Sequence, residues 1–99
     1  MDIVQSKNGV HLRLTDERWA HITEEHNEMA GYYFEVLETI SEPESVYQGK
    51  NGECIAVKSI TDKKFLVVIY RKLREDGFVI TAFLTKKAKQ FERRTRLWP

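Results

Sequence analysis

Cysteine is almost absent from this sequence, and its scarcity narrows the chemistry that the chain can support. The one cysteine among 99 residues is Cys54. A lone cysteine excludes an internal disulfide and a cysteine-based zinc site, and it is typical of a protein in a reducing cytoplasm. Because Cys54 falls within a predicted strand, we expect a structural role rather than nucleophilic chemistry. The cysteine content therefore predicts a cytoplasmic protein.

Long apolar runs are missing as well. The longest run, Phe65 to Tyr70, has the length of a strand, whereas a helix needs roughly 20 apolar residues to cross a bilayer. The first residues, Met1 to Gln5, lack the basic start and the apolar stretch of a secretory signal. We therefore expect no membrane partner.

What the sequence does contain is typical of a folded domain. It is 41% hydrophobic and 31% charged, a globular composition rather than a disordered one. A chain of this length builds one core and is too short for two. We predict a single domain over residues 1–99, with residues 1–9 as a flexible or extended N-terminus.

The charges are unevenly distributed, although the formal net charge is only +1. Acidic residues dominate between Thr15 and Tyr47, where Arg18 is the only base, and basic residues dominate from Lys58 onward. Such asymmetry indicates a polyanionic partner for the second half. Two halves that attract each other across one fold would show the same pattern, so both explanations stay open.

The first half has the residue spacing of helices. Alternation from Val10 to Leu14 predicts a short strand. Thr15 then supplies an N-cap oxygen, and apolar residues at helical spacing predict a helix from Thr15 to about His26. A second helix is predicted from near Met29 to Ile40, before Pro43.

The second half has the period of strands, joined by short turns. Such short connections favour an antiparallel meander, because parallel neighbours need a long crossover. The basic segment from Lys86 to Arg94 predicts a short helix. The predicted fold class is α+β, with two N-terminal helices packed on a roughly four-stranded antiparallel sheet and a short basic C-terminal helix. The predicted strands are Ser45–Gln48, Cys54–Ile60, Phe65–Lys72 and Phe78–Thr85.

Two of the three histidines, His21 and His26, lie five residues apart in the first helix. Zinc motifs on helices place two histidines four residues apart, whereas a spacing of five turns the rings about 140° away from each other on a regular helix. We therefore expect no metal site. His26 shares a stripe with Trp19 and Ile22 that we expect to face the sheet, whereas His21 lies nearer Arg18 and Glu25. Each ring is either a proton-transfer group or an ordinary surface or half-buried histidine.

Polar residues in the two most apolar strands are the next candidates. Arg71 follows the run Phe65–Tyr70, and Thr81 interrupts the strand Phe78–Thr85. They could bind a phosphate together, or Thr81 could simply be a good strand former. Whether they share a face depends on the register of the hairpin, which a slip of one residue reverses.

The C-terminal segment combines bases with aromatic residues. Such a segment can follow a nucleic-acid backbone while an aromatic side chain stacks on a base, although a run of charge is often only a solvated face. The candidate substrate-binding residues are Tyr70, Lys86, Lys87, Arg93 and Arg94.

The order of these pieces resembles a known superfamily. The motifs are Arg18-Trp19-x-His21-Ile22 with His26, then Ile40-Ser41-Glu42-Pro43, Cys54–Lys58, Phe65–Arg71 and Asp76–Phe83. Together they are similar to small phage-associated and bacterial members of the barnase/EndoU/colicin/RelE-like (BECR) nuclease superfamily, over roughly Thr15 to Trp98. One departure is that Asn27-Glu28 follows His26, where Pro-Glu is expected.

The resemblance implies a metal-independent endoribonuclease that cleaves RNA through attack of the 2′-OH, used as a toxin or in phage conflict. It implies that His21 or His26 supplies base and acid, with Glu25 as orienter or substitute. Arg71 and Lys58 would stabilise the phosphate and Thr81 would position it. No cofactor is expected, and the partners would be RNA and an inhibitor or antitoxin protein. The alternative is a non-catalytic RNA- or protein-binding module on the same fold.

Overall fold

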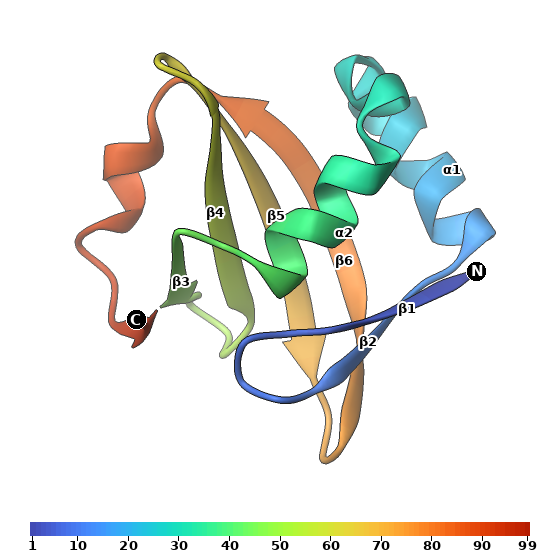
Figure 1. The fold of residues 1–99 in the computed structure, drawn as a ribbon, viewed down its shortest axis with the longest axis horizontal. Helices are drawn as coiled ribbons and strands as arrows, with labels where there is room; N and C mark the ends of the chain where they lie inside the picture. The colour runs from blue at the N-terminus through green and yellow to red at the C-terminus, as the bar shows by residue number, and fades with distance from the viewer.

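The computed structural model describes residues 1–99 as one curved sheet with helices packed against it (Figure 1). The sheet has seven strands in the order β1-β2-β6-β5-β4-β3-β7. The α-helices and 3-10 helices are α1 (Asp16–Glu25), η1 (Asn27–Gly31), α2 (Tyr33–Ser41) and η2 (Ala88–Phe91). The strands are β1 (Asp2–Gln5), β2 (His11–Leu14), β3 (Ser45–Gln48), β4 (Cys54–Thr61), β5 (Lys64–Lys72), β6 (Asp76–Thr85) and β7 (Arg96–Trp98).

The first helix begins and ends close to its predicted limits. The Thr15 side chain accepts a hydrogen bond from the backbone N–H of Arg18 at 3.1 Å, and Asp16 and Glu17 occupy the first turn, where acids suit the helix dipole. The helix stops at Glu25 because His26 leaves helical geometry, with φ −131° and ψ 81°. The predicted second helix from Met29 is wrong at its start, since η1 precedes α2.

The antiparallel meander β3-β4-β5-β6 confirms the four predicted strands. The predicted fold class is nevertheless wrong, because the sheet has seven strands and is mixed. The β1–β2 hairpin joins β6 in parallel, with Leu12 beside Gly77, and β7 pairs with β3. The strands β1, β2 and β7 are short, and they pair at the edges of the meander with residues far away in the sequence. Local periodicity in the sequence does not reveal such pairings.

The predicted basic C-terminal helix is also wrong. The segment forms only the single 3-10 turn η2. Its apolar residues are Ala88 and Phe91, and Phe91 alone is buried. A short helix is stable only when it buries an apolar stripe along its length. Here the ring of Phe91 is the only buried side chain, and it stabilises only the single turn η2.

Strand β5 divides the core into two layers. Leu66, Val68 and Tyr70 point into the cluster that contains the α2 residues Val36 and Ile40. The intervening residues point to the opposite side, where Val67, Tyr47, Ile55, Val57 and Phe91 form the second cluster. Alternation along an extended strand produces this division. Even-numbered residues of β5 therefore point to the helix-covered cluster, and odd-numbered residues point to the other cluster.

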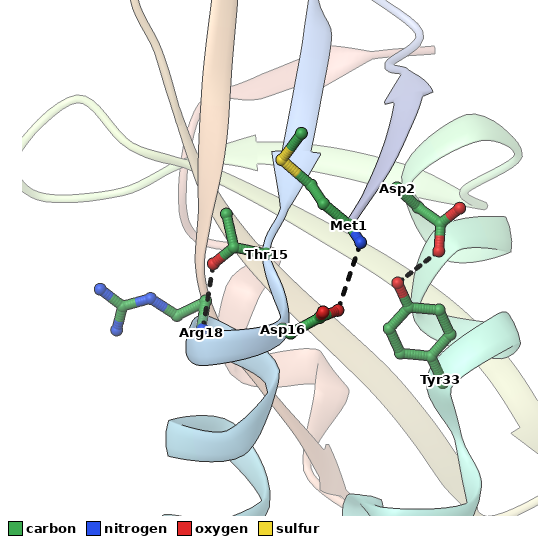
Figure 2. A network of polar contacts seen from close by, with 6 residues as sticks. All are labelled: Met1, Asp2, Thr15, Asp16, Arg18 and Tyr33. Carbon is green, nitrogen blue, oxygen red and sulfur yellow. Dashed lines mark hydrogen bonds and ion pairs between the residues drawn. The ribbon is translucent and has the colours of Figure 1, made fainter.

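The N-terminal strand is fastened to both helices (Figure 2). The amino group of Met1 lies 3.2 Å from a carboxylate oxygen of Asp16, at the start of α1. The hydroxyl of Tyr33, at the start of α2, donates a hydrogen bond to the carboxylate of Asp2. Residues 1–9, predicted to be flexible or extended, thus include an ordered strand. None of the helices has both the length and the apolar character required to cross a membrane.

Gly77 permits β2 to approach β6. A Cβ atom at this position would lie 2.3 Å from the backbone oxygen of Arg71 and 2.7 Å from Leu12 Cδ2. We expect Gly77→Ala to lower the free energy of unfolding by about 1–3 kcal/mol through overpacking, measured by urea unfolding. Gly31→Ala is the control, since nothing lies within 4 Å of its Cβ position. Equal stability of the two variants would contradict the close approach.

Tyr33 makes stability depend on pH in the alkaline range. Burial, followed by the hydrogen bond to Asp2, raises the pKa of Tyr33 from 10.0 to about 12. Between these values the folded chain keeps a proton that the unfolded chain has lost, so stability falls as the pH rises. We expect Tyr33→Phe to show a shallower loss of stability across this window in chemical unfolding. Parallel curves for wild type and variant would refute the assignment.

Candidate functional site

The register of β5 and β6 places Thr81 and Arg71 on the same face of the sheet. Thr81 is the cross-strand partner of Ile69, and Arg71 is the partner of Phe78. The register shifts between these pairs because Ile80 is an extra residue on β6, a β-bulge. Arg71 and Ile69 are two residues apart on one strand and therefore point to the same side.

Thr81 brings a polar atom into apolar surroundings. Its cross-strand partner is Ile69, and Phe83 lies two residues further along β6. The Oγ1 atom of Thr81 is buried and has no hydrogen-bond partner. Such an orphaned hydroxyl costs stability, which is a reason to look for a function at this point of the sheet.

Arg71 has unused hydrogen-bonding capacity. One guanidinium nitrogen donates to the backbone oxygen of Asn51 at 3.1 Å, at the surface. Arginine has five N–H donors in a planar fork, and Arg71 forms no ion pair. The Asn51 contact positions the group and leaves donors for an anion.

His26 reaches this face from the end of α1. Its ring centroid lies 5.9 Å from that of Phe83, with the two planes tilted by 36°, and its side chain is 33% exposed. His26 Nδ1 lies 3.8 Å from a carboxylate oxygen of Glu28, a distance for charge attraction but not for a hydrogen bond. The break between α1 and η1 at His26, together with the contact of both helices with β6, brings this ring to the sheet.

We call this set the β5–β6 strip and define it as His26, Phe83, Thr81, Phe78 and Arg71. Phe83 and Thr81 are two residues apart on β6, about 7 Å at strand rise, and Phe78 follows across the bulge at Ile80. The strip therefore presents, in order, an imidazole, a hydroxyl and a guanidinium. This combination can accept a proton at one end and bind an anion at the other.

The other histidine and its neighbour lie elsewhere. His21 and Glu25 are exposed on α1, where they line a polar hollow of about 290 Å³ together with Thr15, Glu17 and Arg18. The two histidines thus serve different surfaces, and Glu25, although it precedes His26 in the chain, lines the hollow of His21.

Lys58 and Tyr70 also lie away from the strip. Lys58 is the partner of Leu66 on the helix-covered face and forms an ion pair with Glu38 of α2 at 3.2 Å. Tyr70 is fully buried, so it offers no ring for stacking on a base. Its burial, then the neighbouring Cys54, raises the pKa of its hydroxyl, which makes no hydrogen bond of normal geometry.

The basic C-terminal candidates separate into two groups. Lys86 and Lys87 line a cavity of about 770 Å³ on the strip's side of the sheet. Arg93 and Arg94 lie in the turn that follows η2 and do not line this cavity. Only the two lysines are therefore placed next to a concave surface.

The sequence did not single out Arg13 as a site residue. Arg13 is the neighbour of Phe78 in the parallel β2–β6 pair, and its guanidinium binds Asp76 at 2.5 Å. Arg13 and Arg71 therefore flank Phe78 on the same face. The alternation of Leu12, Arg13 and Leu14 did indicate that Arg13 points away from the core; the missing information was the partner strand.

The distribution of ligand-type side chains is also informative. No group of three or more His, Cys, Asp or Glu residues is arranged to hold a metal ion. His26 has Glu28 beside it, and no further residue of these types joins them as a set.

Comparison with protein families identifies the chain's relationship. Residues 1–98 match the model of the family described as phage-Barnase-EndoU-ColicinE5/D-RelE like nuclease2, PBECR2. The chain belongs to this nuclease family. The resemblance to the BECR superfamily is thereby confirmed, and it covers β1 and β2 as well as the predicted region. No curated protein and no solved structure matches this PBECR2 chain.

The orphaned hydroxyl of Thr81 predicts an unusual response to mutation. Thr81→Val keeps the shape and removes the unpaired buried oxygen, so we expect the free energy of unfolding to rise by about 1 kcal/mol. Thr85→Val is the control, because Thr85 Oγ1 accepts a hydrogen bond from the backbone N–H of Lys87 at 3.0 Å and its loss should destabilise. Urea unfolding measures both; a destabilised Thr81→Val would show that its hydroxyl is satisfied.

Proposed function

We propose that this PBECR2 protein is a metal-independent endoribonuclease that cleaves RNA through attack of the ribose 2′-OH. The observation that carries the proposal is the placement of His26, Thr81 and Arg71 on one face of the sheet. Membership of a nuclease family supports cleavage of a nucleic acid. RNA is the substrate that suits the strip, because its 2′-OH is an internal nucleophile that an imidazole can activate.

Each group of the strip has a role in this reaction. His26 accepts the proton of the 2′-OH, whose oxygen forms a bond to phosphorus. The bond from phosphorus to the 5′ oxygen then breaks, and that oxygen takes a proton from water. Arg71 lies two strand steps, about 14 Å, from the Phe83 contact of His26, so its long side chain has to extend back along the strip to stabilise the negative charge that gathers on the phosphate in the transition state. The products are a 2′,3′-cyclic phosphate and a 5′-hydroxyl.

Two neighbours of these groups support the geometry. The Glu28 carboxylate attracts the imidazolium that forms on His26 when it takes the proton. Thr81 lies between the imidazole and the guanidinium, and its hydroxyl, buried and without a partner, would have to turn out of its apolar surroundings to donate to a phosphate oxygen. Arg13 flanks Phe78 on the side opposite Arg71 and, held by Asp76, adds a second guanidinium to this face.

A nuclease of this kind would harm the cell that contains it, which fits a toxin or an effector of conflict between phage and host. An inhibitor or antitoxin protein would then be its natural partner. We expect expression to arrest growth, and His26→Ala or Arg71→Ala to relieve the arrest.

A second candidate is a non-catalytic RNA-binding module. The observation that favours it is that the β5–β6 strip holds only one imidazole, whereas paired acid and base groups are common in metal-free cleavage. Such a module would bind RNA with strong salt dependence and release no products.

His21 and His26 provide a matched test. We expect His26→Ala to lower the rate of RNA cleavage by about 10²–10⁴-fold, the usual contribution of a general base. His21→Ala should cleave at the wild-type rate, because His21 faces the outer hollow. The measurement is single-turnover cleavage of labelled RNA with a chelator present, and the cyclic phosphate is detected on the product.

Three results would count against the proposal. Intact RNA after incubation with wild-type protein would leave only the binding module. Equal losses in His21→Ala and His26→Ala would remove the assignment of His26. Activity that disappears with the chelator and returns with a divalent cation would overturn the metal-independent mechanism.

A further inference from the structure

A cavity of about 770 Å³ lies between the sheet and the segment that follows β6. Its volume is within the range of small-ligand sites, roughly 300–1,000 Å³. The floor includes Val57 and Phe65, and the wall includes Lys86 and Ala88. No residue of the β5–β6 strip lines it, so it is a separate feature of the protein.

The cavity nevertheless lies on the strip's side of the sheet. Phe65 is the partner of Thr85, and the next pair on the same face is Val67 with Phe83. Phe83 is the residue that contacts His26. The cavity therefore begins about 7 Å along the strands from the His26 contact, two residues at strand rise.

The charge around the cavity suits a polyanion. Its basic side chains are Lys63, Lys86, Lys87, Lys89 and Arg96, against the acidic Glu44, Asp62 and Glu92. None of these four lysines forms an ion pair within the protein. Their ammonium groups are available to phosphates.

One aromatic ring in the cavity is suited to stacking. Tyr47 is already covered, by Phe91 at 6.4 Å between ring centroids and by the guanidinium of Arg96 at 5.4 Å. Phe65 lines the cavity and is only partly buried. Aromatic side chains combined with a basic surface are the usual elements of single-strand binding, and they bind every base.

We propose that this cavity is a nucleotide-binding subsite, which holds single-stranded RNA beside the nucleotide that is cleaved on the β5–β6 strip. Phe65 stacks on a base, and Lys63 and Lys86 bind the adjoining phosphates. The inference rests on the proposed function. It narrows the substrate from RNA in general to an unpaired RNA strand that occupies the β5–β6 strip and the cavity at the same time. A strand of several nucleotides reaches the cavity, whereas a dinucleotide occupies the strip alone.

Adjacent lysines provide a matched test of this subsite. Lys63 lines the cavity, whereas Lys64 shares its strand side with Leu66 on the helix-covered face. Lys63→Ala and Lys86→Ala should weaken binding of a single-stranded RNA oligonucleotide, and each should reduce the slope of log K against log salt by about 0.7. Lys64→Ala removes the same charge and should leave affinity and slope unchanged.

The aromatic contribution is tested in the same assay. Phe65→Ala should weaken binding by roughly tenfold or more, and its unfolding curve shows whether the core has been retained. Binding is measured by fluorescence anisotropy in the His26→Ala background, so that cleavage does not consume the RNA. In the wild-type background, Lys63→Ala should raise KM for the oligonucleotide and leave cleavage of a dinucleotide unchanged.

The outcomes separate this inference from the proposed function. Equal effects of Lys63→Ala and Lys64→Ala would overturn the subsite, and so would equal effects on oligonucleotide and dinucleotide. Intact RNA with wild-type protein, together with weaker binding in Lys63→Ala but not Lys64→Ala, would end the nuclease proposal while supporting the cavity as an RNA site. Preference for a duplex over a single strand would overturn the subsite.

Discussion

Alternation along β5 is the constraint on which the rest of this structure depends. The strand is central and covered on both sides, so it sends Leu66, Val68 and Tyr70 under the helices and Val67 and Ile69 toward η2. Burial of both apolar faces holds the strand in one register, because a slip by one residue would exchange the two sets. Arg71 is two residues from Ile69, so it points to the same side of β5 as Ile69 and away from the helix-covered core. The same packing that stabilises the sheet thus selects the face on which Arg71 lies.

Two local departures from regular geometry complete the candidate site. The extra residue Ile80 on β6 lets Val79 enter the core while Thr81 and Phe78 both remain on the strip's face. The end of α1 at Glu25 frees His26 from the helical period and places it against Phe83. On an unbroken helix His26 would have followed the rotation of α1, and the contact would depend on how that helix docks. Bulges of this kind commonly orient side chains beside functional sites.

The sequence predicted the parts whose signals are local. Thr15 and the acids after it defined the start of α1, and the apolar run Phe65–Tyr70 indicated a strand covered on both faces. The pairing of β2 with β6 and of β7 with β3 was missed because each joins residues far apart in the chain through a few backbone contacts. The predicted C-terminal helix failed because the helical propensity of Lys86–Arg94 is not supported by an apolar stripe. The candidate set was correspondingly mixed: His26, Thr81 and Arg71 share a face, whereas Lys58 and Tyr70 point into the helix-covered side.

By itself, the sequence determined the identity of the groups available for chemistry, the strand alternation of β5 and the membership of the BECR superfamily, because these depend on residue type and short spacing. Only the tertiary structure decided that His26 contacts Phe83 on the strip's face of the sheet, that Arg13 joins Arg71 around Phe78, and that the lysines after β6 enclose a cavity. Each of these depends on register, on a bulge or on the docking of a distant segment. Such features arise from the packing of the whole core, and no local pattern encodes them.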